Sequence, residues 1–223
     1  LHVDGGTARA VGDAAATATA KLDMPSLLAL AAALGWASGF RLYAVVFLVG
    51  MMGVLGWMPL PPGLAVLQNP LVLMVSGVLL MVEFFADKVP WVDSAWDALH
   101  AFIRVPAGAA LAYGVFGADN ATMAVVAGLL GGSLSATALA TKMTTRAAVN
   151  TSPEPFSNWG LSFFEDGLVV AVVWLATQHP VAFGIALVVM VAVSVLLLVV
   201  LFKFLRAVVR RLSSFFSGSA KVA

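Results

Sequence analysis

The sequence has no cysteine and only three histidines, and each shortage excludes a kind of chemistry. Without cysteine there can be no disulfides, thiolate nucleophiles or cysteine-ligated metals and clusters. His2, His100 and His179 are scattered, so they predict no imidazole site for zinc or haem. No phosphate-binding loop, nucleophile elbow or metalloprotease helix can be recognised either. We therefore expect no cofactor, no catalytic residues and no enzymatic activity.

Charge is also scarce, at 10% of 223 residues, whereas hydrophobic residues make up 61% of the chain. The mean hydropathy is +1.01. Soluble domains carry about a quarter charged residues and somewhat under half apolar ones. A chain of this size cannot bury so much apolar surface in one core. The composition excludes a soluble enzyme, a nucleic-acid binder and a disordered tail, and it predicts an integral membrane protein in contact with lipids.

Apolar segments follow one another closely from Asp23 onward. A helical span needs about 20 apolar residues, and helices satisfy all their backbone groups within lipid. Proline or glycine occurs in each break between segments. We predict an all-α polytopic membrane protein with about six transmembrane helices. The predicted spans are 24–57, 70–86, 101–117, 122–149, 160–177 and 180–207.

The flanking segments and the basic residues suggest an orientation. Residues 1–22 predict a flexible cytoplasmic tail, residues 23–207 the transmembrane domain, and residues 208–223 a basic cytoplasmic tail. Lys203, Arg206, Arg210 and Arg211 place the C-terminal end on the cytoplasmic side of the inner membrane by the positive-inside rule. Six spans then place the N-terminus on the same side.

A weak internal repeat links the two halves of the chain. Gly35–Ser38 and Gly132–Ser135 both read G-x-x-S, about ten residues into their segments. The pattern favours three-plus-three inverted repeats, 23–117 and 119–207, with Ser38 and Ser135 at helix breaks. The first segment is too long for one straight span, and it can be either one bent span or a re-entrant pair. Alternatively, small residues at this spacing simply allow close helix packing.

Acidic residues gather after the second predicted span. Glu83 and Asp87 are four residues apart and share a helical face, as do Asp93 and Asp97. Such carboxylates could bind a cation, with Glu83 and Asp87 as ligands if a metal is bound, or pass protons. For Asp93 and Asp97 we favour a wet loop in which they pair with Lys88 and Arg104.

A second polar stretch precedes the fifth predicted span. Glu154 lies between two prolines, and Asn158 is placed to cap the next helix. At least one of Glu165 and Asp166 should face the bundle interior, near Lys142 or Arg146.

Arg41 is the only charged residue of the first segment. It could bind an anionic lipid head group, but an internal pair with Glu83, Asp87 or Glu165 is preferred.

Two motifs resemble those of a known family. The pattern E-F-x-A-D-K-x-P-x-x-D (Glu83 to Asp93), with S-P-E-P-x-S-N (Ser152 to Asn158), resembles a bacterial family of integral membrane proteins classed as a domain of unknown function. The resemblance covers most of residues 25–200 and implies no particular activity. The chain is also distantly similar to cation/proton exchangers with duplicated E-x-G-D-[KR]-[ST] motifs. Here, however, the acids are four residues apart, the glycine is absent, and only one half has the following lysine.

These observations lead to one functional prediction and its alternatives. We expect a small secondary transporter or permeation protein for a cation, protons or a small polar solute, with its carboxylates near the cytoplasmic side. The alternatives are a protein that binds or translocates anionic lipid and a structural subunit of a membrane complex. A homo-oligomer is compatible with each of them. The predicted ion- or substrate-binding residues are Ser38, Arg41, Glu83, Asp87, Lys88, Ser135, Lys142, Arg146, Glu165 and Asp166.

Overall fold

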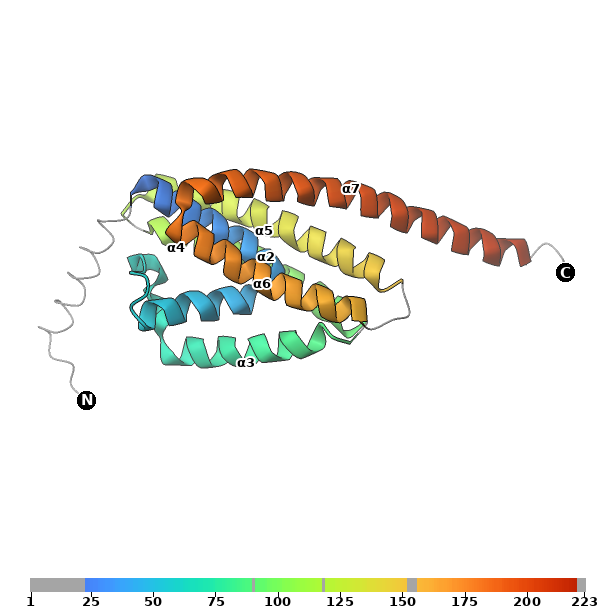
Figure 1. The fold of residues 1–223 in the computed structure, drawn as a ribbon, viewed down its shortest axis with the longest axis horizontal. Coiled ribbons are helices and arrows are strands. Elements are labelled where there is room, and N and C mark those ends of the chain that lie inside the picture. Colours follow the sequence, from blue (N-terminus) through green and yellow to red (C-terminus); the bar gives the residue numbers. More distant parts are fainter. Residues whose placement is uncertain (1–22, 90, 118, 152–155, 220–223) are drawn as a thin grey trace, which may run out of the picture.

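The protein is a bundle of long helices that run roughly side by side (Figure 1). The computed structural model describes residues 23–89, 91–117, 119–151 and 156–219, with side chains up to Arg211. The predicted N-terminal tail and Glu154 lie outside the described residues.

The elements in chain order are α2 (Met24–Val54), the 3-10 helix η1 (Pro62–Gln68), α3 (Pro70–Ala86), α4 (Val92–Phe116), α5 (Ala121–Val149), α6 (Phe156–Gln178) and α7 (Pro180–Ser219). The described part of the chain has no strand. Five helices are long and apolar enough to cross a membrane, or six if η1 and α3, which bend by 68°, form one span. The prediction of an all-α membrane protein with about six spans is confirmed.

Short polar side chains begin several of the helices. Asn69 accepts a hydrogen bond from the Leu71 N–H at the start of α3. Asp23 caps α2, and both the hydroxyl and the N–H of Ser26 donate to its carboxylate. Because these bonds stabilise the charged form, they hold the pKa of Asp23 below its ordinary value.

α2 consists of two half-helices joined at Arg41, whose backbone is non-helical (φ −145°, ψ 80°). In the first half, Gly35 packs against Gly131 of α5, and Gly39 packs against Ser135 one turn further along α5. The first half therefore runs in the same direction as α5. A break near residues 38–41 was predicted, and the structure places it at Arg41.

After Arg41 the chain turns back. Phe47 packs against Gly77 of α3, and Gly50 packs against Leu73, so the order of contacts descends along α3. Since α3 and α5 run in the same direction (Figure 1), the two halves of α2 run in opposite directions. The first segment therefore folds as a helical hairpin that turns at Arg41.

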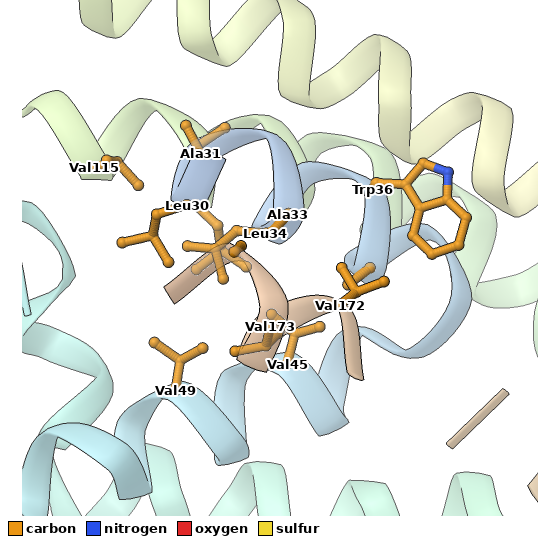
Figure 2. Packing of buried hydrophobic residues seen from close by; sticks show 14 of the residues in the cluster. Leu30, Ala31, Ala33, Leu34, Trp36, Val45, Val49, Val115, Val172 and Val173 are labelled. Carbon is orange, nitrogen blue, oxygen red and sulfur yellow. The ribbon is translucent and has the colours of Figure 1, made fainter. Parts of the chain in front are cut away.

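The hairpin is held together by the apolar core. Figure 2 shows Leu30 and Leu34 of the first half around the same core as Val45 and Val49 of the second half. Val173 of α6 also belongs to this core. In a hairpin packed in this way, most backbone N–H and C=O groups form hydrogen bonds within their own half-helix. Only the groups at the break need hydrogen-bond partners from elsewhere.

The hairpin changes the expected topology. α2 begins and ends at one end of the bundle, and α7 ends beyond the other end (Figure 1). The start of α2 and the far end of α7 therefore lie at opposite ends of the bundle, whereas the prediction placed the two ends of the chain on one side. That prediction assumed six complete spans, whereas α2 returns to the end at which it starts.

The polar stretch before the third predicted span is helical. α4 begins at Val92, nine residues before the predicted start at 101, so the predicted wet loop around Asp93 and Asp97 is wrong. The side chains of Asp93, Asp97 and Arg104 are buried because neighbouring helices supply charged partners, namely Arg146, Lys142 and Glu83.

Candidate functional site

Arg41 extends from the break of α2 toward α6 and the end of α3. Its Nη2 lies 3.0 Å from Asp87 Oδ2, and its Nε lies 3.1 Å from Asp166 Oδ1. Nη2 also donates to the hydroxyl of Ser162 at 2.8 Å. Of the two roles considered for Arg41, the structure has the internal ion pair, and the side chain is fully buried.

A second group of charges joins α3 to α4. Asp97 and Arg104 are two helical turns apart and share one face of α4. Arg104 Nη1 donates to Asp97 Oδ1 at 2.7 Å, and Nη2 donates to Glu83 Oε1. The predicted pairing of Asp97 with Arg104 is present, in a buried site between helices.

Arg146 joins α5 to α6 and to the end of α3. Its Nη2 lies 2.7 Å from Glu165 Oε2 and 3.2 Å from Asp87 Oδ2, and its Nη1 donates to the Asp87 carbonyl at 2.7 Å. Asp93 of α4 lies 3.7 Å from Arg146 Nη1. Asp87 at the end of α3 and Glu165 of α6 therefore meet at one cation.

Lys142 lies one turn before Arg146, and its amine is surrounded by oxygen atoms. Nζ donates to the carbonyl of Phe40 at 3.1 Å, immediately before the break in α2. Four carboxylates lie around the same Nζ: Asp97 at 3.2 Å, Asp87 at 3.3 Å, and Glu83 and Glu165 at 3.7 Å each. These side chains come from α3, α4 and α6 or from the residue that ends α3.

An amide cluster borders this network. Asn150 donates to Asp93 and to the Ser94 hydroxyl at 3.1 Å, and Asn158 donates to Asn150 at 2.8 Å. Asn158 lies inside α6, which begins at Phe156, so its predicted capping role is wrong. Its amide instead joins two helices through Asn150.

Three predicted site residues lie apart from the ion pairs. The Ser38 hydroxyl donates to the Leu34 carbonyl within its own helix. Ser135 donates to the Arg104 carbonyl at 3.0 Å, and α5, all of whose residues are described, continues through it without a break. The predicted second break is therefore wrong. Lys88 donates to the Phe84 carbonyl at 3.0 Å, and its amine lies over the Phe84 ring.

The formal charges of the buried network do not balance. Among the described residues, four buried cations (Arg41, Arg104, Lys142 and Arg146) face five carboxylates whose side chains are at most 2% exposed. One negative charge is in excess; at the edge, Asp166, whose side chain is 28% exposed, is offset by the charge of Lys88. Six buried atoms of the network have no hydrogen-bond partner within the described part of the chain: the oxygens Glu83 Oε2, Asp87 Oδ1 and Asp97 Oδ2, and the nitrogens Arg41 Nε, Arg41 Nη1 and Arg104 Nε.

An apolar cavity of about 320 Å³ adjoins the network between α2, α5, α6 and α7. Trp36, Phe40 and Phe164 line it, and Lys142 and Glu165 form part of its wall. Trp36 Nε1 is buried and has no hydrogen-bond partner among the described residues. The cavity therefore connects an apolar space to the charged side chains.

No group of three acidic or histidine side chains in the described residues has the geometry of a metal site, so the structure gives no support to Glu83 and Asp87 as metal ligands. The sequence interpretation also missed two polar partners, Ser162 and Asn150. For Asn150 the spacing was a usable signal, because Lys142, Arg146 and Asn150 recur every four residues along one helical face.

Comparison with known proteins agrees with the motif resemblance. No curated protein and no solved structure matches the chain significantly. Residues 28–200 match the sequence profile of a family, and this span includes the whole charged network. The chain therefore belongs to the family described as a domain of unknown function (DUF4126).

Proposed function

We propose that the protein is a small secondary transporter or permeation protein of the inner membrane, for a cation, protons or a small polar solute. The observation that carries this proposal is the buried, charge-unbalanced network at the break of the α2 hairpin. Ionisable side chains within a membrane are costly and usually functional. Apolar residues of similar volume often stabilise a protein as well as buried ion pairs do. Stability alone therefore explains this network poorly.

The α2 hairpin also supports a role in transport. In many transporters a helix is interrupted within the membrane, and the free backbone groups at the interruption bind the substrate or the coupling ion. Here the Phe40 carbonyl at the break accepts a hydrogen bond from the Lys142 amine. Several helices converge on this point, so a small shift of one helix would alter the contacts of several charges.

The basic residues suggest the orientation. The helix connections at the end of the bundle where α2 begins, 55–69, 117–120 and 178–179, contain no lysine or arginine, whereas the sequence before α2 has Arg9 and Lys21. Lys203 and Arg206 belong to the C-terminal half of α7, and α7 leaves the bundle at the other end (Figure 1). By the positive-inside rule this second end faces the cytoplasm, and the start of α2 faces the opposite side.

Flux measurements in proteoliposomes test the proposal. We expect Asp87→Asn and Asp166→Asn to lower proton or monovalent-cation flux on the order of tenfold, because a hydrogen bond to a charged group contributes about 1.5–3 kcal/mol. Asp119→Asn, an exposed acid in the segment before α5, is the matched control and should keep the wild-type rate. Unchanged flux in both network variants would contradict the proposal.

Lipid binding is a second candidate function, and the apolar cavity between α6 and α7 favours it. Arg41 does not support an anionic head group, because its guanidinium is already paired with carboxylates. A lipid chain in the cavity should copurify with the protein and be detected by mass spectrometry. Ser194→Phe, which fills the cavity, should remove it, whereas Leu196→Phe on the exposed side of α7 should not.

A further inference from the structure

The last helix, α7, is far longer than a membrane crossing requires. Its 40 residues extend about 60 Å, whereas the hydrocarbon core of a bilayer is about 30 Å thick. Residues 180–202 contain no charged side chain and already cover about 34 Å. Lys203 is therefore the first charged residue beyond the apolar span, and α7 continues past the ends of the other helices (Figure 1).

Exposed tryptophans mark the depth at which this part of α7 lies. Trp174 and Trp159 are exposed near the two ends of α6, and tryptophan is enriched at both membrane–water interfaces. Leu161 of α6 and Leu197 of the antiparallel α7 line the same cavity, so they lie at a similar depth. Toward the end where α6 begins, Trp159 lies about 3 Å beyond Leu161, and Lys203 lies about 9 Å beyond Leu197. Lys203 is thus outside the level of Trp159, in the head-group layer.

The basic residues of α7 continue the side of the helix that faces away from the bundle. Within the span, strongly exposed apolar side chains recur every three or four residues: Val181, Ile185 and Val188. Lys203, Arg206 and Arg210 repeat this spacing, and all three are exposed. At about 100° per residue they lie on the same face as that apolar series and opposite Phe183 and Ser194, which are buried against the bundle. This face presents hydrocarbon along the span and positive charge just beyond it.

No acid of α7 competes for these charges. Residues 167–223 contain no aspartate or glutamate. Lys203, Arg206 and Arg210 border one hollow over Ala207, which leaves room for an anionic group between them. Arginine binds phosphate through paired charge-assisted hydrogen bonds, and basic residues beside a span are attracted to anionic lipid. Their long side chains can also reach back toward the bilayer surface.

We propose that Lys203, Arg206 and Arg210 form a face that binds the phosphate head groups of anionic phospholipid. None of the three belongs to the buried charged network, so this binding face is independent of the proposed transport. Lipid bound there holds α7 at a fixed depth in the bilayer.

The first experiment removes the charge of the whole face. A variant that combines Lys203→Gln, Arg206→Gln and Arg210→Gln is compared with wild type by native mass spectrometry in detergent. Phosphatidylglycerol and phosphatidylcholine with the same acyl chains are the probes. The affinity for phosphatidylglycerol should fall about fivefold for each charge removed, on the order of a hundredfold in all, and that for phosphatidylcholine should not change. The variant should stay folded with an unchanged thermal midpoint, because the three side chains are exposed.

The second experiment separates a binding face from a general attraction to positive charge. Arg211 is also exposed and lies beside Arg210, but it is turned about 100° around α7. Arg210→Gln should weaken phosphatidylglycerol binding about fivefold, whereas Arg211→Gln should weaken it less than about twofold. Arg210→Lys keeps the charge and should retain most of the affinity.

Two results would overturn the binding face. One is an equal loss of affinity in Arg210→Gln and Arg211→Gln. The other is an unchanged preference for phosphatidylglycerol in the triple variant; if its oligomeric state in size-exclusion chromatography changed as well, the face would belong to a contact with a second copy of the chain.

Discussion

The excess negative charge of the network predicts unequal effects for two substitutions at one ion pair. Arg104→Met removes a cation and leaves Glu83 and Asp97 without the guanidinium that both contact. Breaking a buried pair by removing one partner costs about 3–5 kcal/mol. Glu83→Gln removes a carboxylate from the side that is in excess, keeps an oxygen to accept from Arg104, and adds a donor where Oε2 has no hydrogen-bond partner in the described residues. Its cost should stay below about 1 kcal/mol, the typical worth of a hydrogen bond.

Thermal unfolding in one detergent measures the difference. For a chain of this size 1 kcal/mol corresponds to about 2–4 °C, so Arg104→Met should lower the midpoint by about 6–20 °C and Glu83→Gln by at most about 4 °C. The exposed Arg206→Met controls for loss of an arginine and should change stability by less than about 0.5 kcal/mol. The double variant should regain about 0.5–3 kcal/mol relative to the sum of the single ones. Equal destabilisation by both single substitutions would refute the charge count, because Glu83 would then be as necessary as Arg104.

The hairpin and its packing give two further predictions. The chain has no native cysteine, so single cysteines can report which side of the membrane each position faces. Met24→Cys and Trp57→Cys should both react with a membrane-impermeant maleimide from one side, and Val89→Cys should react from the other side. Reaction of positions 24 and 57 from opposite sides would show that α2 spans the membrane. Gly35→Val should lower the free energy of unfolding by about 1–3 kcal/mol or more, because a Cβ there would lie 2.5 Å from a backbone carbon of α5. Thermal unfolding measures this loss. Gly167→Ala is its control, with no atom within 4 Å of the added carbon, and equal losses in both would contradict the close packing.

The helices that could be predicted from the sequence are those marked by local chemistry. The range 70–86 was predicted for α3 and is observed, because Asn69 supplies a cap and Pro70 fits the first helical position. The predicted range 122–149 for α5 differs by one residue from the observed helix, which Asn120 caps. In both cases the signal that starts the helix lies within a few residues of it.

The errors arose where distant partners determine the structure. The charges of residues 93–104 suggested contact with water, but Arg104 meets Glu83 of α3 and Asp93 lies near Arg146 of α5. These contacts join residues 21 and 53 positions apart, and no local pattern in a single sequence reveals them. The direction of the second half of α2 was unpredictable for the same reason, since its packing against α3 decides it.

The break in α2 and the charged network depend on each other. A break inside the bundle leaves the Phe40 carbonyl without a helical partner, and an unsatisfied buried polar group costs about 1–3 kcal/mol. Lys142 supplies that partner, but a lone buried ammonium would be more costly still without the carboxylates around it. Those carboxylates in turn require the three arginines. The hairpin thus explains why charges gather at this depth, and Lys142 is the residue through which a change in the network would reach the backbone of α2.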